Sequence, residues 1–336
     1  MRISTGLPIG VTALLFGAAG RRKSLEDALV GRLVGNDYSE VVLPILDYAE
    51  PYEALLSPAS RGELYRFVDR DGEVLALRSD FTPLLARLIA PRLGGLSLPL
   101  RLFYRGDVVR WAEERAGRLR ESYQVGAELL GEDGEAAEAE VLRLFLDLLA
   151  STGVPRPAVI VGFAGALDEL LLSAGAGSTS GAADLAAAVA RRERSAVRRL
   201  GGSTALLEVV DRGIPDDPAA LGKAGERLAR CVETVAALSG LHPEVAIGVD
   251  LAEFAQLTVD PHLGTSDSSQ RSYYDGLVFR GYAGAGGIEI GGGGRYNRLF
   301  DQLGVDLPAV GFTLGLDGLT SVAPAAAAGA RQETST

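Results

Sequence analysis

Two polar residues with an even spacing, Gln124 and Glu128, lie in the segment ESYQVGAELL, whose composition is typical of a β-strand. Alternate residues of a strand point to the same face, so these two side chains share one face. A carboxylate and an amide that face inward are costly unless they bind a partner. One interpretation is a polar ligand pocket in which Glu128 binds a cation such as an α-amino group or an imidazolium. The other is exposure to solvent on an open face of the sheet, and the spacing alone does not separate the two.

A second polar group occurs where a strand is expected to pass into a helix. The segment LRSDFT places Arg78, Asp80 and Thr82 at this junction. Polar side chains at such junctions often form binding sites. Capping of the helix by Asp80 or Thr82 explains the same residues equally well.

Single residues near strand ends are further candidates. Arg110 ends the segment LRLFYRGDVVR and could clamp a carboxylate or a phosphate, or else form a surface ion pair with a glutamate of the following loop. Tyr273 and Tyr274 open the segment YYDGLVF, so they face opposite sides of the expected strand. Packing in the core is the usual role of such aromatic residues.

The glycine cluster Gly284–Gly294 fits no nucleotide-binding motif closely. A phosphate-binding loop requires Lys followed by Ser or Thr, whereas Arg295 and Tyr296 follow here. A dinucleotide-binding fingerprint requires a third glycine at the position of Glu289. The pattern favours close backbone packing beside a sheet or a ligand, with Arg295 and Tyr296 able to project into a pocket.

Composition excludes several classes of function. The 336 residues include two histidines and one cysteine, which rules out an internal disulfide framework and argues against a Cys/His metal centre. Neither histidine has a partner suited to nucleophilic catalysis, so both are expected at the surface. The net charge of −11 disfavours nucleic-acid binding. Residues 3–20 carry no charge, but the basic residues follow this run rather than precede it, so we expect a buried lead-in and no signal or membrane segment.

Hydrophobic patterning predicts strands joined mostly by hairpins, without strict strand–helix–strand alternation. In chain order we expect a helix over Ser24–Val34 capped by Ser24, a strand over Tyr38–Leu46, two strands within Tyr65–Leu77, a helix over Thr82–Ile89, a hairpin of Leu100–Arg110 and Glu121–Leu130, a helix over Glu135–Ala150, a strand over Ala158–Phe163, helices over about 165–240, and strands within Val245–Asp250, Arg271–Tyr282, Gly287–Gly291 and Ala309–Gly315. This order favours an α+β fold with a mainly antiparallel sheet.

Several ordered blocks resemble the catalytic domain of class II histidyl-tRNA synthetases across about residues 5–320. The blocks are LPIGV at 7–11, VVLPIL at 41–46, LRSDFTPLLAR at 77–87, FYRGDVVR at 103–110, ESYQVGAELLG at 121–131, YYDGLVF at 273–279, GGGRY at 292–296 and AVGFTLGLDGL at 309–319. The resemblance implies an antiparallel sheet of six or seven strands flanked by helices and a dimer formed around Tyr38–Leu46. It also implies one domain over 1–320, with a helical insertion at about 165–240 and a low-complexity tail over 321–336.

Two departures from the synthetase pattern remove cations that adenylation requires. Ser269 stands where the resemblance places a catalytic arginine, and about Gly318 stands where it places an ATP-binding arginine. An anticodon-binding domain is not expected in this chain either. We therefore expect no catalytic residue, no cofactor, no metal and no nucleic-acid partner.

The amino-acid side of the pocket keeps the synthetase pattern. The resemblance implies a histidine-binding set of Asp80, Thr82, Arg110, Gln124, Glu128, Tyr273, Tyr274 and Tyr296, although Asp80 replaces a usual glutamate. A histidine pocket without adenylation machinery is similar to the regulatory subunits of ATP phosphoribosyltransferase, the enzyme of the first step of histidine biosynthesis. That family implies a cytoplasmic hetero-octamer with a short-form catalytic subunit, self-association as a dimer, and histidine as feedback effector. The alternatives are a histidine-activating synthetase-like enzyme without a tRNA substrate, or a histidine sensor with another partner.

Overall fold

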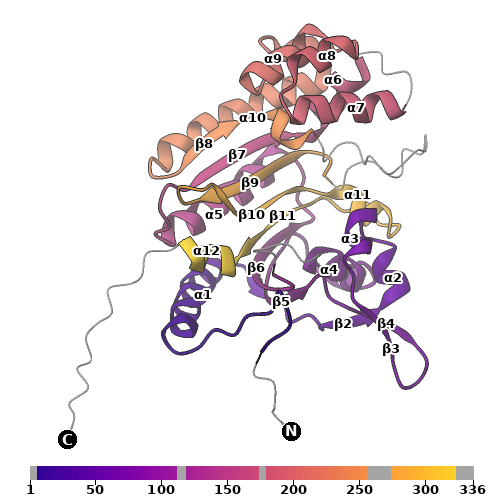
Figure 1. The fold of residues 1–336 in the computed structure, drawn as a ribbon, viewed down its shortest axis with the longest axis vertical. Coiled ribbons are helices and arrows are strands. Elements are labelled where there is room, and N and C mark those ends of the chain that lie inside the picture. Colours follow the sequence, from indigo (N-terminus) through magenta and orange to yellow (C-terminus); the bar gives the residue numbers. More distant parts are fainter. Residues whose placement is uncertain (1–5, 112–118, 174–178, 256–273, 323–336) are drawn as a thin grey trace, which may run out of the picture.

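An eight-stranded sheet forms the centre of the molecule. The computed structural model describes residues 6–111, 119–173, 179–255 and 274–322 (Figure 1). The strands follow the spatial order β1-β5-β6-β11-β10-β9-β7-β8, in which only the β1–β5 and β7–β8 pairs are parallel. Their bounds are β1 (Ser39–Glu40), β5 (Leu100–Val109), β6 (Glu121–Leu130), β7 (Ala158–Phe163), β8 (Ala246–Val249), β9 (Leu277–Ala283), β10 (Ile288–Arg295) and β11 (Ala309–Gly315). The mainly antiparallel α+β fold is confirmed, with eight strands instead of six or seven because short strands extend both edges.

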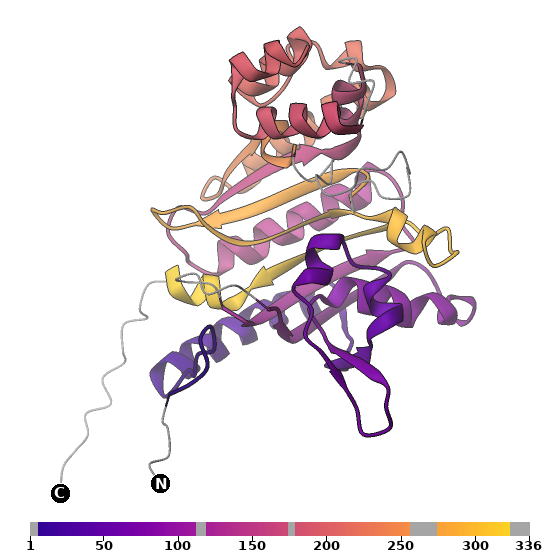
Figure 2. The ribbon, with the colours of Figure 1, turned by 45° about the vertical axis from the view of Figure 1, so that its right-hand side comes forward.

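One face of the sheet is covered by helices and carries the main core. The covering helices are α1 (Gly17–Gly35), α5 (Glu135–Ser151), α10 (Gly222–Leu241) and α12 (Leu316–Val322), and Figure 2 shows α5 lying along this face. Odd-numbered residues of β6, such as Val125 and Leu129, point into this core. Phe145 of α5 packs edge-on against Phe279 and Phe312. This face is therefore closed by apolar packing, and polar chemistry is left to the opposite face.

The opposite face is only partly covered. Helices α4 (Phe81–Ile89) and α11 (Asn297–Asp301) pack over one part of it, together with the short 3-10 helix η1 (Ala90–Gly95). A second, three-stranded sheet lies nearby, with β2 (Leu46–Tyr48), β3 (Arg66–Val68) and β4 (Val74–Leu77), flanked by α2 (Ala49–Glu53) and α3 (Pro58–Gly62). The uncovered part of the large sheet is where a ligand can approach the strands.

A separate helical cluster lies at one end of the molecule. It contains α6 (Ala164–Ser173), α7 (Thr179–Ala190), α8 (Arg194–Arg199), α9 (Thr204–Arg212) and the 3-10 helices η2 (Pro218–Leu221) and η3 (Leu251–Phe254) (Figure 1). These helices share their own hydrophobic cluster with the first turns of α10. The division of the chain into one core domain with this insertion and a tail over 321–336 stays a prediction.

The N-terminal part differs from expectation in two places. Helix α1 starts at Gly17 rather than Ser24, so Ser24 and Asp27 lie inside a continuous helix, where Asp27 forms an ion pair with Lys23 instead of closing a cap. The expected buried lead-in is wrong over residues 6–16: no helix or strand lines up its apolar side chains, and Phe16 is 92% exposed. The helices of the described ranges include none that is long and apolar enough to cross a membrane.

The expected strand over Tyr38–Leu46 is divided into β1 and β2. Val41 still donates its amide to the Phe103 carbonyl at 2.8 Å, but the chain then leaves the large sheet for the small one. The buried Arg78 guanidinium holds this crossing, because it donates to the carbonyls of Leu43 and Pro44 at 2.8 and 3.1 Å. Arg78 is therefore a structural residue, separate from the neighbouring polar site.

The expectation that both histidines lie at the surface is wrong for His242. His242 is not at the surface but 7% exposed, because it closes the end of α10 beside α5. Its Nε2 lies 3.7 Å from a carboxylate oxygen of Asp147 on α5. His262 falls outside the described residues.

Candidate functional site

A cleft of about 420 Å³ opens on the uncovered face of the large sheet. It is lined by Asp80, Arg110, Gln124, Tyr274, Val278, Phe279, Arg280, Glu289, Ile290, Gly291, Gly292, Gly293, Thr313 and Gly315. Four of these residues are glycines, so bare backbone forms much of the wall. A Cβ atom on Gly293 would lie 2.0 Å from the Gly311 carbonyl oxygen, which agrees with the close backbone packing that the glycine cluster favours.

Opposite charges meet at one end of the cleft. Asp80 caps helix α4 by accepting the Thr82 amide at 3.0 Å, and its side chain is still 43% exposed. Arg110 donates from Nε to the Ser79 carbonyl at 2.8 Å, and its Nη2 lies 3.9 Å from the Asp80 carboxylate. Desolvation raises the pKa of the Asp80 carboxyl, while the charge of Arg110 opposes that shift. Helix capping and a polar site are therefore compatible at this junction.

A buried carboxyl group lies next to the cleft wall. Glu128 of β6 is 1% exposed, and hydroxyl groups surround it. Its Oε1 accepts from Thr82 Oγ1 at 2.7 Å and from the Tyr104 hydroxyl at 3.0 Å. Its Oε2 accepts from the Tyr296 hydroxyl at 2.5 Å. Burial raises the pKa of Glu128 to about 7, although these hydroxyl donors lower it in part.

A buried cluster reaches the cleft through Thr313. The cluster consists of Thr82, Tyr104, Glu128 and Tyr296. Thr313 lines the cleft, and its Oγ1 lies 3.2 Å from the Tyr104 hydroxyl. A ligand that binds Thr313 or displaces it therefore contacts the hydrogen-bond network of Glu128.

Two glycines make room for this network. A Cβ on Gly126 would lie 2.5 Å from the Tyr104 ring, and one on Gly311 would lie 1.6 Å from Glu128 Oε2. Gly126 and Gly311 belong to β6 and β11, the two paired strands that support the cluster. The backbone of these strands is therefore fitted to a buried tyrosine and a buried carboxyl.

The structure brings seven of the eight predicted residues together in two layers. Asp80, Arg110, Gln124 and Tyr274 line the cleft, whereas Thr82, Glu128 and Tyr296 belong to the buried cluster. Tyr273 lies outside the described residues. Gln124 and Glu128 share one face of β6 as their spacing predicts, and the solvent-exposed interpretation of Glu128 is wrong.

Arg295 does not project into the cleft. Neighbouring strand residues point to opposite faces, so Tyr296 reaches Glu128 while Arg295 enters the opposite side of the sheet. There Arg295 is 1% exposed and donates from Nε to Glu138 at 2.6 Å.

Four contributors to the site were not predicted: Tyr104, Arg280, Glu289 and Thr313. Even spacing along β5 offered a signal for Tyr104, since it is the one hydroxyl-bearing residue in an apolar stretch of that strand. Arg280 lies at the other end of the cleft and pairs with Glu253 at 3.3 Å. Local patterns do not reveal which strands are neighbours, so Arg280, Glu289 and Thr313 had no signal. Within the described ranges, no group of three or more His, Cys, Asp and Glu side chains could hold a metal ion.

Comparisons with known proteins agree on one family. The family model described as histidyl-tRNA synthetase matches residues 10–319. An ATP phosphoribosyltransferase regulatory subunit of Moorella thermoacetica is 33% identical, and the match covers 96% of this chain and 84% of that protein. A crystal structure of an ATP phosphoribosyltransferase regulatory subunit/histidyl-tRNA synthetase from Bacillus halodurans is 25% identical with a TM-score of 0.80, over 96% of this chain and 84% of that one. An ATP phosphoribosyl transferase (HisG:HisZ) complex from Thermotoga maritima shares the fold at 18% identity and a TM-score of 0.64, over 88% of this chain and 97% of that one.

Proposed function

We propose a function on the premise that this chain belongs to the family of ATP phosphoribosyltransferase regulatory subunits and carries a histidyl-tRNA synthetase domain over residues 10–319. The proposed function is to bind histidine in the cleft and to control a separate, short-form catalytic subunit in the cytoplasm. The bound subunit joins ATP to phosphoribosyl pyrophosphate, and this chain contributes no catalytic residue to that reaction.

The chemistry of the cleft supports histidine as the ligand. Free histidine offers an α-amino group, a carboxylate and an imidazole. Asp80 can accept from the amino group, and Arg110 can donate to the carboxylate from the same end of the cleft, since both side chains are more than two-fifths exposed. Gln124 and Tyr274 line the adjoining wall and can contact the ring.

The observation that carries the proposal is the buried Glu128 next to this wall. Its pKa of about 7 lies close to that of imidazole, so both groups change protonation near neutral pH. Thr313 and Tyr104 connect the cleft to this carboxyl through a chain of hydrogen bonds. Burial of a carboxyl group is costly. Recognition of a ring that gains and loses a proton in the same pH range would explain why Glu128 is buried here.

The non-catalytic role is supported by the residues at the two adenylation positions. Gly318, in helix α12, offers no side chain to an ATP phosphate. Ser269, at the other position, lies outside the described residues. Without these two cations, charge that develops on phosphates during adenylation lacks its expected stabilisation.

The partner is inferred from the family and from one solved complex of the same fold. Regulatory subunits require a catalytic subunit, and the Thermotoga maritima structure is described as a complex. We propose a hetero-octamer in which this chain dimerises around Tyr38–Leu46. Histidine would act by favouring one conformational state of that complex over another.

Calorimetric titration of the full chain with histidine tests the binding function. We expect wild-type protein to release or absorb heat with a single site per chain, and Glu128→Gln to weaken affinity about tenfold or more, equivalent to about 1.4 kcal/mol. Glu121→Gln is the matched control, because Glu121 opens the same strand at an exposed position. The proposal fails if wild-type protein shows no binding or if Glu128→Gln binds as tightly as the control.

A further inference from the structure

A second buried ionic cluster lies on the helix-covered face of the sheet, behind the cleft. Glu138 of α5 accepts from Arg295 Nε at 2.6 Å, and their side chains are 7% and 2% exposed. Arg295 Nη2 also donates to the Gly134 carbonyl at 2.8 Å. Burial of an ion pair recovers its desolvation cost only with good geometry and further hydrogen bonds. The Glu138–Arg295 pair meets both conditions, so it holds the two side chains in fixed positions within the core.

Glu138 fixes the segment that carries Tyr296. Arg295 precedes Tyr296 in the chain, and the Tyr296 hydroxyl donates to Glu128 at 2.5 Å. The adjacent side chains of Arg295 and Tyr296 therefore bond to Glu138 on one side of the sheet and to Glu128 on the other. Movement of Tyr296 shifts the backbone that presents Arg295 to Glu138.

Glu138 also fixes the other tyrosine segment. Leu277, three residues after Tyr274, donates its amide to Glu138 Oε1 at 3.4 Å. A Cβ on Gly276 would lie 2.8 Å from the same oxygen, so the carboxylate packs directly on this backbone. One carboxylate thus anchors the segments of both Tyr274 and Tyr296.

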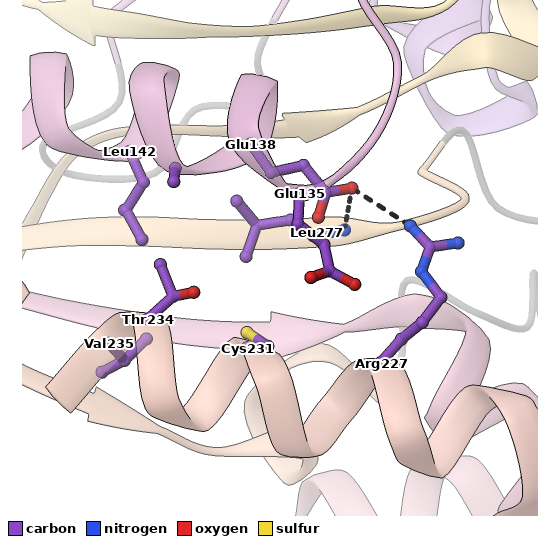
Figure 3. A pocket seen from close by; sticks show the side chains of 9 residues that line it. Glu135, Glu138, Leu142, Arg227, Cys231, Thr234, Val235 and Leu277 are labelled. Carbon is purple, nitrogen blue, oxygen red and sulfur yellow. Dashed lines mark hydrogen bonds and ion pairs between the residues drawn. The ribbon is translucent and has the colours of Figure 1, made fainter. Parts of the chain in front are cut away.

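The third contact of Glu138 comes from α10, the helix that leads out of the helical cluster. Figure 3 shows Arg227 reaching toward Glu138, and its Nη2 lies 3.4 Å from Glu138 Oε1. Its guanidinium lies over the Phe163 ring, 4.8 Å from the ring centroid. A void of about 10 Å³ lies among Glu138, Arg227 and Cys231, room for about one water molecule. The Arg227 side chain is itself 36% exposed, so its guanidinium can leave Glu138 toward solvent without displacing a core side chain.

We infer that Glu138 and Arg227 couple occupancy of the cleft to the packing of α10 against α5. This inference rests on the proposed histidine function and names the element that responds to it. A ligand in the cleft contacts Tyr274 directly and reaches Tyr296 through the hydrogen bonds of Thr313, Tyr104 and Glu128, so it acts on both segments that orient Glu138. The oriented carboxylate then favours the position of α10 in which Arg227 is paired, and by linkage this packing favours the bound ligand.

The single cysteine of the chain provides a probe of this contact. Cys231 follows Arg227 by one helical turn, faces α5 in Figure 3 and is buried. Its side chain is 8% exposed and packs beside Glu138 and Leu142 of α5, and burial raises its pKa to about 12, so a chromogenic disulfide reagent reacts with it slowly unless the packing of α10 against α5 opens. In the full-length wild-type chain, we expect saturating histidine to slow labelling about fivefold or more.

Arg227→Met is the test variant and Arg230→Met is its matched control. Arg230 lies on the same helix and pairs with Glu135 of α5, but it does not contact Glu138. We expect Arg227→Met to bind histidine by calorimetry and to be labelled at the same rate with and without it. Arg230→Met should keep the wild-type slowing.

Two results would overturn the coupling while leaving histidine binding intact. In the first, wild-type protein binds histidine but labelling does not change. In the second, Arg227→Met shows the same slowing as Arg230→Met. If wild-type protein shows neither binding heat nor a change in labelling, the proposed histidine function fails and the coupling fails with it.

Discussion

At the scale of single residues, Glu128 is the most constrained group of the site. It is a carboxyl without a cationic partner in its immediate contacts, and three hydroxyls satisfy both of its oxygens. The glycine at position 311 leaves the space that its Oε2 occupies. Such an arrangement is expected for recognition rather than for stability, because the ionised carboxylate is disfavoured by burial.

The stability of the chain should report the protonation of Glu128. The pKa is about 7 in the folded state against an ordinary value of 4.5, so between these values the folded state holds a proton that the unfolded state releases. The protonated Glu128 therefore adds to the free energy of unfolding at pH 4.5. This contribution, at most about 3 kcal/mol, is lost as the pH rises through 7. We expect the free energy of unfolding of wild-type protein to fall over this range relative to Glu128→Gln.

Urea unfolding of both proteins at several pH values between 4.5 and 8 measures this difference. Because all other groups are shared, subtracting the two curves isolates position 128. Parallel curves would show that Glu128 titrates normally and is not held in the buried network.

At the scale of elements, the start of helix α4 combines a helix cap with a wall of the cleft. Asp80 caps α4 and also faces the cleft, so its two roles can be separated by substitution. Asn keeps the capping oxygen and removes the charge, whereas Ala removes both. We expect Asp80→Ala to lower the free energy of unfolding by about 1 kcal/mol and Asp80→Asn to lower it by much less.

Both Asp80 variants should lose histidine affinity to a similar extent. Urea unfolding measures what the cap contributes to the free energy of unfolding, and calorimetry measures what the charge contributes to histidine affinity. If Asp80→Asn binds histidine as wild-type protein does, the carboxylate does not contact the amino group. If Asp80→Asn is as unstable as Asp80→Ala, the cap is not the source of the stability.

Prediction from sequence succeeded where one local pattern determines the element. The hairpin of β5 and β6 was bounded to within one residue, because long strands with turn residues at both ends leave little choice. Helix α1 was placed seven residues late, because Ser24 and Asp27 resemble a cap inside what is a continuous helix. Local signals identify residues that suit a helix end, but tertiary packing decides where the helix starts.

The site was predictable only in part for a related reason. Even spacing placed Gln124 and Glu128 on one face, and neighbouring positions on β10 could have separated Arg295 from Tyr296. Tyr104 and Thr313 meet across 209 residues of chain, through the β5-β6-β11 pairing order. That order comes from the packing of the whole sheet, so local patterning does not contain it.

At the scale of the whole molecule, the fold has a binding face and a helix-covered face joined by one strand segment. The cleft lies on the first face, and the Glu138 cluster lies on the second. The net charge of −11 disfavours nucleic-acid binding, in line with the proposed binding of a small ligand and a protein partner. In the regulatory role that we propose, both faces act together in a complex.

Reconstitution with a short-form ATP phosphoribosyltransferase catalytic subunit tests this regulatory role. The rate of pyrophosphate release is measured with and without this chain, and with and without histidine. We expect the wild-type chain to raise the rate and to make it sensitive to histidine, whereas Glu128→Gln should raise the rate with sensitivity reduced about tenfold or more. An unchanged rate and an unchanged response to histidine on adding the wild-type chain would contradict the account.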